Sequence, residues 1–74
     1  MDPWRYCARR YTRHFLDRAS GRMLPADQVD RALIEGDKVP VGEGKYEVRW
    51  RSWRLVVRVG RCNLVLITAY RKPG

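Results

Sequence analysis

The sequence predicts an α+β fold in which two N-terminal helices pack on one face of a three- or four-stranded twisted antiparallel sheet. Three observations predict it. Apolar residues in the first half recur at helical spacing, those in the second half alternate as in strands, and a Pro- and Gly-containing break from Pro40 to Gly44 separates the halves. The chain has 74 residues, the length of a single domain, so we assign 1–74 to one α+β domain.

The two helices are expected at about residues 10–22 and 25–35. Their apolar stripes are Tyr11, Phe15 and Ala19 in the first, and Val29, Ala32 and Leu33 in the second. Thr12 is a candidate N-cap that would shorten the first helix. Pro25 suits the first position of the second helix, and Gly36 suits the residue after its end.

Three strands are expected in the second half, at about residues 45–50, 53–59 and 62–70. A two-residue turn, Arg51-Ser52, places Trp50 opposite Trp53 on the same face of the first two strands. One face then carries Tyr46, Val48, Trp50, Trp53, Leu55 and Val57, and the other carries Lys45, Arg49, Arg54 and Arg58. The helices would cover the tryptophan face and leave the basic face open.

The face occupied by Thr68 and Tyr70 depends on the turn at Gly60-Arg61. A two-residue turn points them toward the tryptophan face, whereas a three-residue turn with a bulge places them with Arg54 and Arg58. The sequence leaves both registers open.

The composition is strongly basic, which bears on partners rather than on fold. Lysine and arginine total 16 against 8 aspartate and glutamate, a formal net charge of +8, and all but three of the 16 are arginines. A guanidinium binds phosphate with two hydrogen bonds and stacks on bases. We expect RNA as the partner, before DNA, although thermophilic growth or GC-rich coding also enriches arginine.

No apolar run is long enough to span a bilayer and no signal peptide is recognisable, so we expect a cytoplasmic protein without a membrane partner. Cys7 and Cys62 form no Cys-x-x-Cys pair, and one histidine cannot complete a zinc site with them. Neither a metal nor a cofactor is expected. We interpret the cysteines as half-buried thiols; the alternative, a bridge between them, would be unusual in a mesophilic cytosol.

The only histidine, His14, falls on the first predicted helix, with Arg18 four residues later on the same face. Metal-independent RNA cleavage needs a base for the 2′-hydroxyl, an acid for the leaving 5′ oxygen and cations for the phosphorane charge. His14, Tyr70 and nearby arginines would supply these functions, and the 2′-hydroxyl would select RNA over DNA. The alternative is an ordinary helix histidine.

A basic sheet with interleaved aromatic residues is typical of surfaces that follow phosphates and stack bases. Strand parity places Trp50 and Trp53 opposite Arg54 and Arg58, so the tryptophans are expected in the core. The residues expected to bind nucleic acid are Arg49, Arg54, Arg58, Arg71 and Lys72.

The order of these motifs resembles a known group. His14-x-x-x-Arg18, then Arg22, a Pro-x-Asp-Gln-Val helix and a last strand Leu-Ile-Thr-Ala-Tyr are similar to small uncharacterised domains of the RelE-like toxin superfamily, related to barnase-like and colicin-type ribonucleases. The resemblance spans about residues 11–71. It implies ribonuclease ancestry, with His14, Arg18, Thr68 and Tyr70 as the matching positions, and an antitoxin as a possible partner. A homodimer is the alternative, because a chain of this length has a small core and dimerisation would bury more.

Two departures from that pattern concern the first helix and the turn after it. Phe15 stands where the group has a small residue, and Met23-Leu24 stands where it has Gly-Ile. The sequence therefore supports three hypotheses: a toxin-like endoribonuclease or translation inhibitor, a non-catalytic nucleic-acid-binding module of viral or mobile-element type, and a protein-interaction domain.

Overall fold

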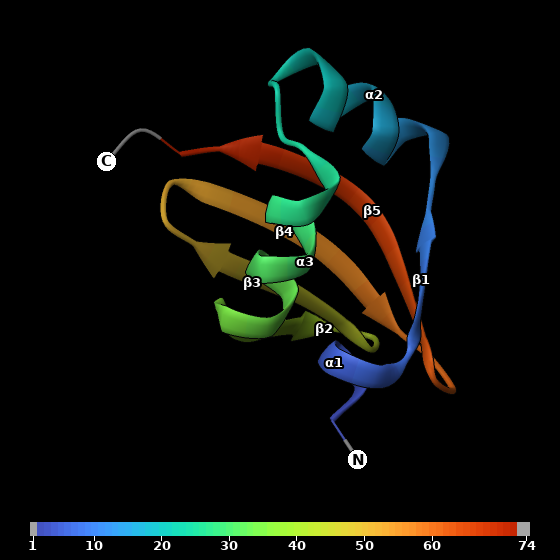
Figure 1. The fold of residues 1–74 in the computed structure, drawn as a ribbon. Coiled ribbons are helices and arrows are strands. Elements are labelled where there is room, and N and C mark those ends of the chain that lie inside the picture. The colour runs from blue at the N-terminus through green and yellow to red at the C-terminus, as the bar shows by residue number, and fades with distance from the viewer. Residues whose placement is uncertain (1, 73–74) are drawn as a thin grey trace.

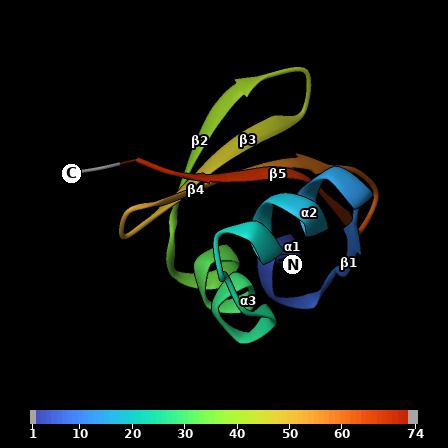
Figure 2. The same ribbon diagram turned by 90° about the horizontal axis from the view of Figure 1, so that it is seen from above.

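The computed structural model describes residues 2–72, and these form three helices and five strands (Figure 1). In chain order they are α1 Pro3–Tyr6, β1 Ala8–Tyr11, α2 Arg13–Gly21, α3 Ala26–Glu35, β2 Asp37–Gly42, β3 Lys45–Trp50, β4 Trp53–Val59 and β5 Asn63–Arg71. The strands make one sheet in the order β1-β5-β4-β3-β2. Seen from above, the helices lie on one side of it (Figure 2).

The α+β class is confirmed, but the predicted sheet was wrong in two respects. It has five strands rather than three or four, and it is mixed, because β1 runs parallel to β5 while the other pairs are antiparallel. β3 and β4 coincide with the ranges expected for the first two strands. The two additional strands, β1 and β2, lie in segments that were predicted as helix and loop.

The first predicted helix begins later than expected, and its first residues belong to β1. Thr12 is the N-cap of α2, and its Oγ1 accepts a hydrogen bond from the Phe15 amide at 3.1 Å. Tyr11 fits the apolar spacing of the helix but precedes this cap, so it reaches Phe15 from a strand, with 5.8 Å between the ring centroids. The helix therefore covers Arg13–Gly21 and not residues 10–22.

β2 was missed because Pro40 and Gly42 look like loop residues. It pairs with β3, and the register shifts between these two positions. Proline lacks the amide hydrogen of a paired strand, but β2 is an edge strand, where a missing donor on the open side costs little. A third helix, α1, also precedes the predicted elements.

The core lies between the helices and the sheet face that carries the tryptophans. Phe15 and Ala19 of α2 and Val29, Ala32 and Leu33 of α3 are buried against Val48, Leu55, Val57, Leu64 and Leu66 of the sheet. Trp50 and Trp53 are only 6% and 7% exposed, so they are core residues, as strand parity predicted. No helix within residues 2–72 is long and apolar enough to cross a membrane.

A bulge inside β5 resolves the register that the sequence left open. Val59 pairs with Leu64, and this parity continues to Val57 and Leu66. The register then shifts by one residue at Ile67, so that Thr68 pairs with Val56 and Tyr70 with Arg54. Thr68 and Tyr70 therefore join the basic face, but a mid-strand bulge, not the turn at Gly60-Arg61, puts them there.

Cys7 and Cys62 are joined by a disulfide, with 4.5 Å between their Cα atoms. The interpretation as two half-buried thiols is thus replaced by the alternative, a bridge. It connects the residue before β1 to the turn between β4 and β5 and closes a loop across most of the chain.

Candidate functional site

The sheet face away from the helices, here called the open face, carries most of the predicted site residues. Side chains alternate along each strand, so the open face is built from every second residue, with the β5 bulge resetting the count. Its polar members are Arg10 of β1, Asp37 of β2, Lys45, Glu47 and Arg49 of β3, Arg54 and Arg58 of β4, and Asn63, Thr68 and Tyr70 of β5. Its two carboxylates are Glu47, in the middle of β3, and Asp37, at the start of the edge strand.

His14 lies at the edge of the open face because the start of α2 is tied to β5. The Thr12 hydroxyl that caps the helix also donates to the carbonyl oxygen of Leu66 at 2.8 Å. Two residues later, Nε2 of His14 lies 3.1 Å from Oγ1 of Thr68. One threonine thus begins the helix and places the imidazole against the second threonine, where the ring stays exposed to solvent.

Tyr70 and Glu47 form the centre of the site. The Tyr70 hydroxyl donates to Oε2 of Glu47 at 2.6 Å, and Nε of Arg49 donates to Oε1 at 2.7 Å. These two hydrogen bonds lower the pKa of Glu47, so its carboxylate stays ionised. The bond to Glu47, and then burial, raises the pKa of Tyr70. Tyr70 is therefore a hydrogen-bond donor that retains its proton at neutral pH.

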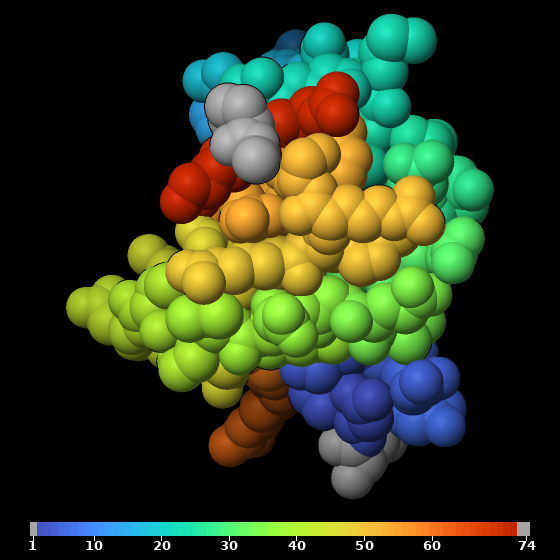
Figure 3. All heavy atoms as spheres, turned by 90° about the vertical axis from the view of Figure 1, so that its left-hand side faces the viewer, coloured from blue at the N-terminus to red at the C-terminus, as the bar shows by residue number. Residues whose placement is uncertain are grey.

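The cations around the turn between β3 and β4 form a second part of the site. We call this group the hairpin cluster: Arg49, Arg51, Arg54, Arg71 and Lys72. The Arg54 guanidinium donates to the carbonyl oxygens of Arg51 and Trp53 at 3.0 and 2.9 Å. The Lys72 amide donates to Ser52 at 2.8 Å, which holds the end of β5 beside this turn (Figure 3).

Two arginines of the hairpin cluster stack on the core tryptophans from outside. The guanidinium carbon of Arg51 is 4.5 Å from the Trp50 ring centroid, and that of Arg71 is 5.2 Å from the Trp53 centroid. Planar contacts of this kind hold the guanidinium groups in defined positions. The tryptophan and arginine pattern of the sequence therefore serves to orient cations rather than to stack bases directly.

The structure brings some predicted residues together and separates others. His14, Thr68 and Tyr70 share one region, where Thr68 and Tyr70 are two residues or about 7 Å apart along β5. Arg18 lies one turn beyond His14 on the same side of α2 and is exposed. Arg58 is at the other end of the open face, where it pairs with Lys45 and Val65 and not with the hairpin cluster.

Glu47 is the functional candidate that sequence reasoning missed. Its alternation with Lys45 and Arg49 placed it on the open face, but its partner Tyr70 could not be assigned to the same face before the bulge was known. An acid between two cations on one strand of a basic sheet face was the available signal.

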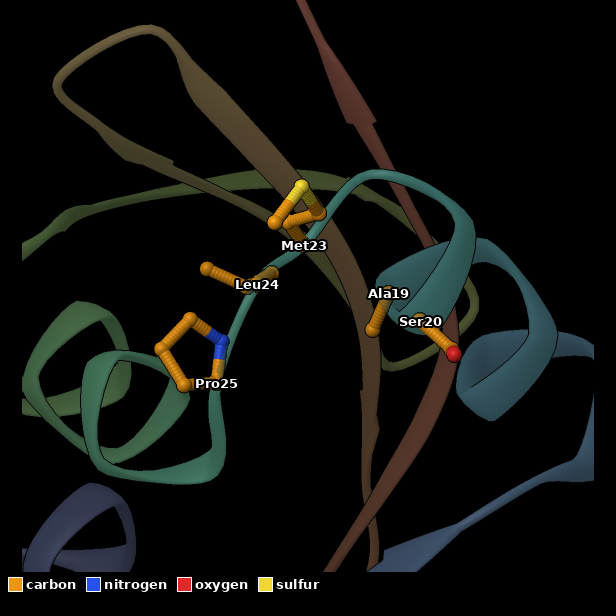
Figure 4. A pocket seen from close by; sticks show the side chains of 5 residues that line it. All are labelled: Ala19, Ser20, Met23, Leu24 and Pro25. Atoms are coloured by element: carbon orange, nitrogen blue, oxygen red, sulfur yellow. The ribbon is translucent and has the colours of Figure 1, made fainter.

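An apolar hollow lies between α2 and α3, away from these groups. Two adjoining cavities of about 370 and 220 Å³ share Ala19, Ser20 and Leu24. Figure 4 shows Met23, Leu24 and Pro25 on the connection between the helices, beside Ala19 and Ser20 at the end of α2. The walls contain no carboxylate, imidazole or thiol, so the hollow is suited to apolar contact rather than to proton transfer.

Comparison with known proteins gives one family and one solved structure. The family described as "Domain of unknown function (DUF4258)" matches residues 11–71. The toxin–antitoxin complex RelBE2 from Mycobacterium tuberculosis contains a chain with a TM-score of 0.62 and 18% sequence identity, and the match covers 89% of this chain and 91% of that chain. No curated protein matches. The likeness to RelBE2 establishes a toxin–antitoxin-like fold.

Proposed function

This chain belongs to the DUF4258 family, a domain of unknown function, and we propose that it is a toxin-like protein that cleaves RNA without a metal ion. The observation that carries the proposal is the grouping on the open face of His14 with Thr68, and of Tyr70 with Glu47, beside the hairpin cluster. A proton-transfer group, a retained hydrogen-bond donor and arginines on one exposed surface are the parts that phosphodiester cleavage needs. The fold shared with a toxin–antitoxin complex supports the toxin-like part of the proposal.

In the proposed reaction, a ribose 2′ oxygen attacks its own phosphorus and the bond to the 5′ oxygen of the next nucleotide breaks. The products are a 2′,3′-cyclic phosphate and a 5′-hydroxyl end. Nε2–H of His14 would donate to Oγ1 of Thr68, which holds the ring, and Nδ1, the other ring nitrogen, would take the 2′ proton. The leaving oxygen would take its proton from solvent, with Tyr70 as an auxiliary hydrogen-bond donor. Arg18 and Arg54 would hold the phosphate.

The test is incubation of labelled single-stranded RNA with wild-type protein, His14→Ala and Arg13→Ala, in EDTA. Arg13 is the matched control because it is an equally exposed neighbour on α2. We expect wild type and Arg13→Ala to produce cyclic phosphate ends, and His14→Ala to be slower by about 10²–10⁴-fold. Equal cleavage by His14→Ala would remove the histidine from the mechanism, and no cleavage by the wild type would refute the ribonuclease.

Binding of nucleic acid without cleavage is the second candidate function, and the hairpin cluster favours it. Its five cations lie around one turn, which suits a phosphate backbone. Affinity for single-stranded RNA should fall with salt, with a slope of log K against log salt of about −0.7 for each phosphate neutralised. Replacing Arg71 and Lys72 by Ala should reduce that slope. Arg58 lies at the end of the open face away from the hairpin cluster, so a smaller slope in Arg58→Ala would show that the bound RNA extends to that end. The same titration is run with duplex DNA. Tighter binding of duplex DNA than of single-stranded RNA would mean that DNA, not RNA, is the ligand.

A protein partner is the third element of the proposal. The similar solved structure is a toxin–antitoxin complex, and a chain of net charge +8 attracts an acidic protein. We propose an antitoxin-like partner, with a second copy of this chain as the other outcome. Light scattering of the purified chain measures self-association. Co-expression with the adjacent open reading frame tests the partner, and separate elution of the two proteins would reject it.

A further inference from the structure

We propose that the disulfide between Cys7 and Cys62 is a redox latch that keeps His14 in place on the open face. The bond joins the residue before β1 to the turn before β5. Cys62 is exposed, whereas Cys7 is only 5% exposed. Cys62 thus lies at the surface, and Cys7 belongs to the packed part of the domain. The effect of the latch on RNA rests on the proposed function, but its effect on structure does not.

A short stretch of chain connects the bond to His14. From Cys7, the four residues of β1 run parallel to β5 as far as Tyr11, which pairs with Leu66. The next residue is Thr12, whose hydroxyl caps α2 and donates to the Leu66 carbonyl oxygen. His14 follows with its hydrogen bond to Thr68. A displacement of β1 along β5 would therefore move the cap and the imidazole together.

Apart from the disulfide, one neighbouring strand, β5, and the Thr12 hydrogen bonds at its end hold β1 to the sheet. It is a four-residue edge strand, and its Ala8 amide donates to the carbonyl oxygen of Cys62 itself at 3.3 Å. The main anchor away from the sheet is Arg9, which donates to the Trp4 carbonyl oxygen at 2.6 Å and pairs with Asp30 at 2.8 Å. A short edge strand with few partners belongs to the part of a protein that opens locally before the rest unfolds.

The chemistry of the switch is ordinary thiol–disulfide exchange. A thiolate of a dithiol reductant attacks Sγ of Cys62, the cysteine at the surface, and releases the Cys7 thiolate, which takes up a proton. The second thiol of the reductant then displaces Cys62 from the mixed disulfide. Two electrons pass from the dithiol, which leaves as its own disulfide, to the protein, which ends with two thiols. Oxidation by a disulfide of the same class restores the latch.

The experiment compares oxidised wild type, wild type reduced with dithiothreitol, and the Cys7→Ser/Cys62→Ser double variant. Amide hydrogen exchange is followed in peptides covering residues 8–16 and, as the internal control, residues 45–59. Binding of single-stranded RNA is measured on the same samples. We expect reduction to speed exchange several-fold in 8–16 with a smaller change in 45–59, and to weaken RNA binding. The double variant should behave as reduced wild type and ignore dithiothreitol.

Three results would overturn the latch: two alkylatable thiols in protein never exposed to reductant, equal acceleration in both peptides, or no acceleration in either. Equal acceleration would mean that the bond stabilises the whole fold without acting on the site. Local loosening of 8–16 with no RNA binding in any redox state would uphold the latch as a structural device and refute the proposed function instead.

Discussion

Thr12 gives the sharpest test of how the candidate site is built, because one hydroxyl makes hydrogen bonds both to α2 and to β5. It accepts from the Phe15 amide at 3.1 Å and donates to the Leu66 carbonyl oxygen at 2.8 Å. Thr12→Val keeps the shape of the side chain and removes both bonds. Loss of an N-cap costs about 1 kcal/mol, and loss of a hydrogen bond from a half-buried hydroxyl costs about 1 kcal/mol more. We expect Thr12→Val to be less stable by about 2 kcal/mol.

Thermal unfolding followed by circular dichroism measures this directly, and for a domain of this size the expected loss lowers Tm by about 10 °C. Thr12→Ser is the matched control, since it keeps the hydroxyl and should remain close to the wild type. RNA cleavage or binding should fall in Thr12→Val and persist in Thr12→Ser, because His14 is positioned through this cap. Equal Tm values for Thr12→Val and the wild type, or equal losses in both variants, would refute the reasoning.

Two further predictions concern packing and pH. A methyl group at Gly36 would lie 2.6 Å from a carbonyl oxygen of α3 and 2.8 Å from Cγ1 of Val48. Gly36→Ala should therefore lower the free energy of unfolding, measured in urea, by about 1–3 kcal/mol or more. Gly21→Ala is the control, because its methyl group would meet no atom within 4 Å and should not destabilise the fold. The raised pKa of Tyr70 and the lowered pKa of Glu47 both stabilise the fold at neutral pH; this stability is lost as pH rises above 10.0 and as it falls below 4.5. Tyr70→Phe should weaken both losses, and unchanged pH profiles would contradict the hydrogen bond.

The elements that could be predicted from the sequence are those whose signals are local. The second helix, β3 and β4 each carry their own period of apolar residues, and the two-residue turn Arg51-Ser52 carries the parity from one strand to the next. That parity was enough to place Trp50 and Trp53 in the core and Arg54 on the open face. Thr12 was identified as a candidate cap from residue type alone.

The two missed strands have no such local signal. β1 is four residues long, is continuous with the apolar spacing of the helix after it, and pairs with a strand at the other end of the chain. β2 contains Pro40 and Gly42, residue types that are typical of loops but are tolerated in an edge strand with a bulge. Gly36 follows the end of α3 as expected, but its φ is −72°, so its small size serves the close approach of β3 rather than a left-handed turn.

The sequence by itself determined the basic charge, the helical and strand halves, and the separation of an apolar face from a cationic one, because composition and periodicity are properties of neighbouring residues. Only the tertiary structure decided that β1 lies beside β5, that Cys7 meets Cys62, and that a bulge at Ile67 turns Thr68 and Tyr70 toward the open face. Each of these depends on contacts between segments far apart in the chain. The candidate site depends on such contacts, since His14, Thr68, Tyr70 and Glu47 come from three different parts of the sequence.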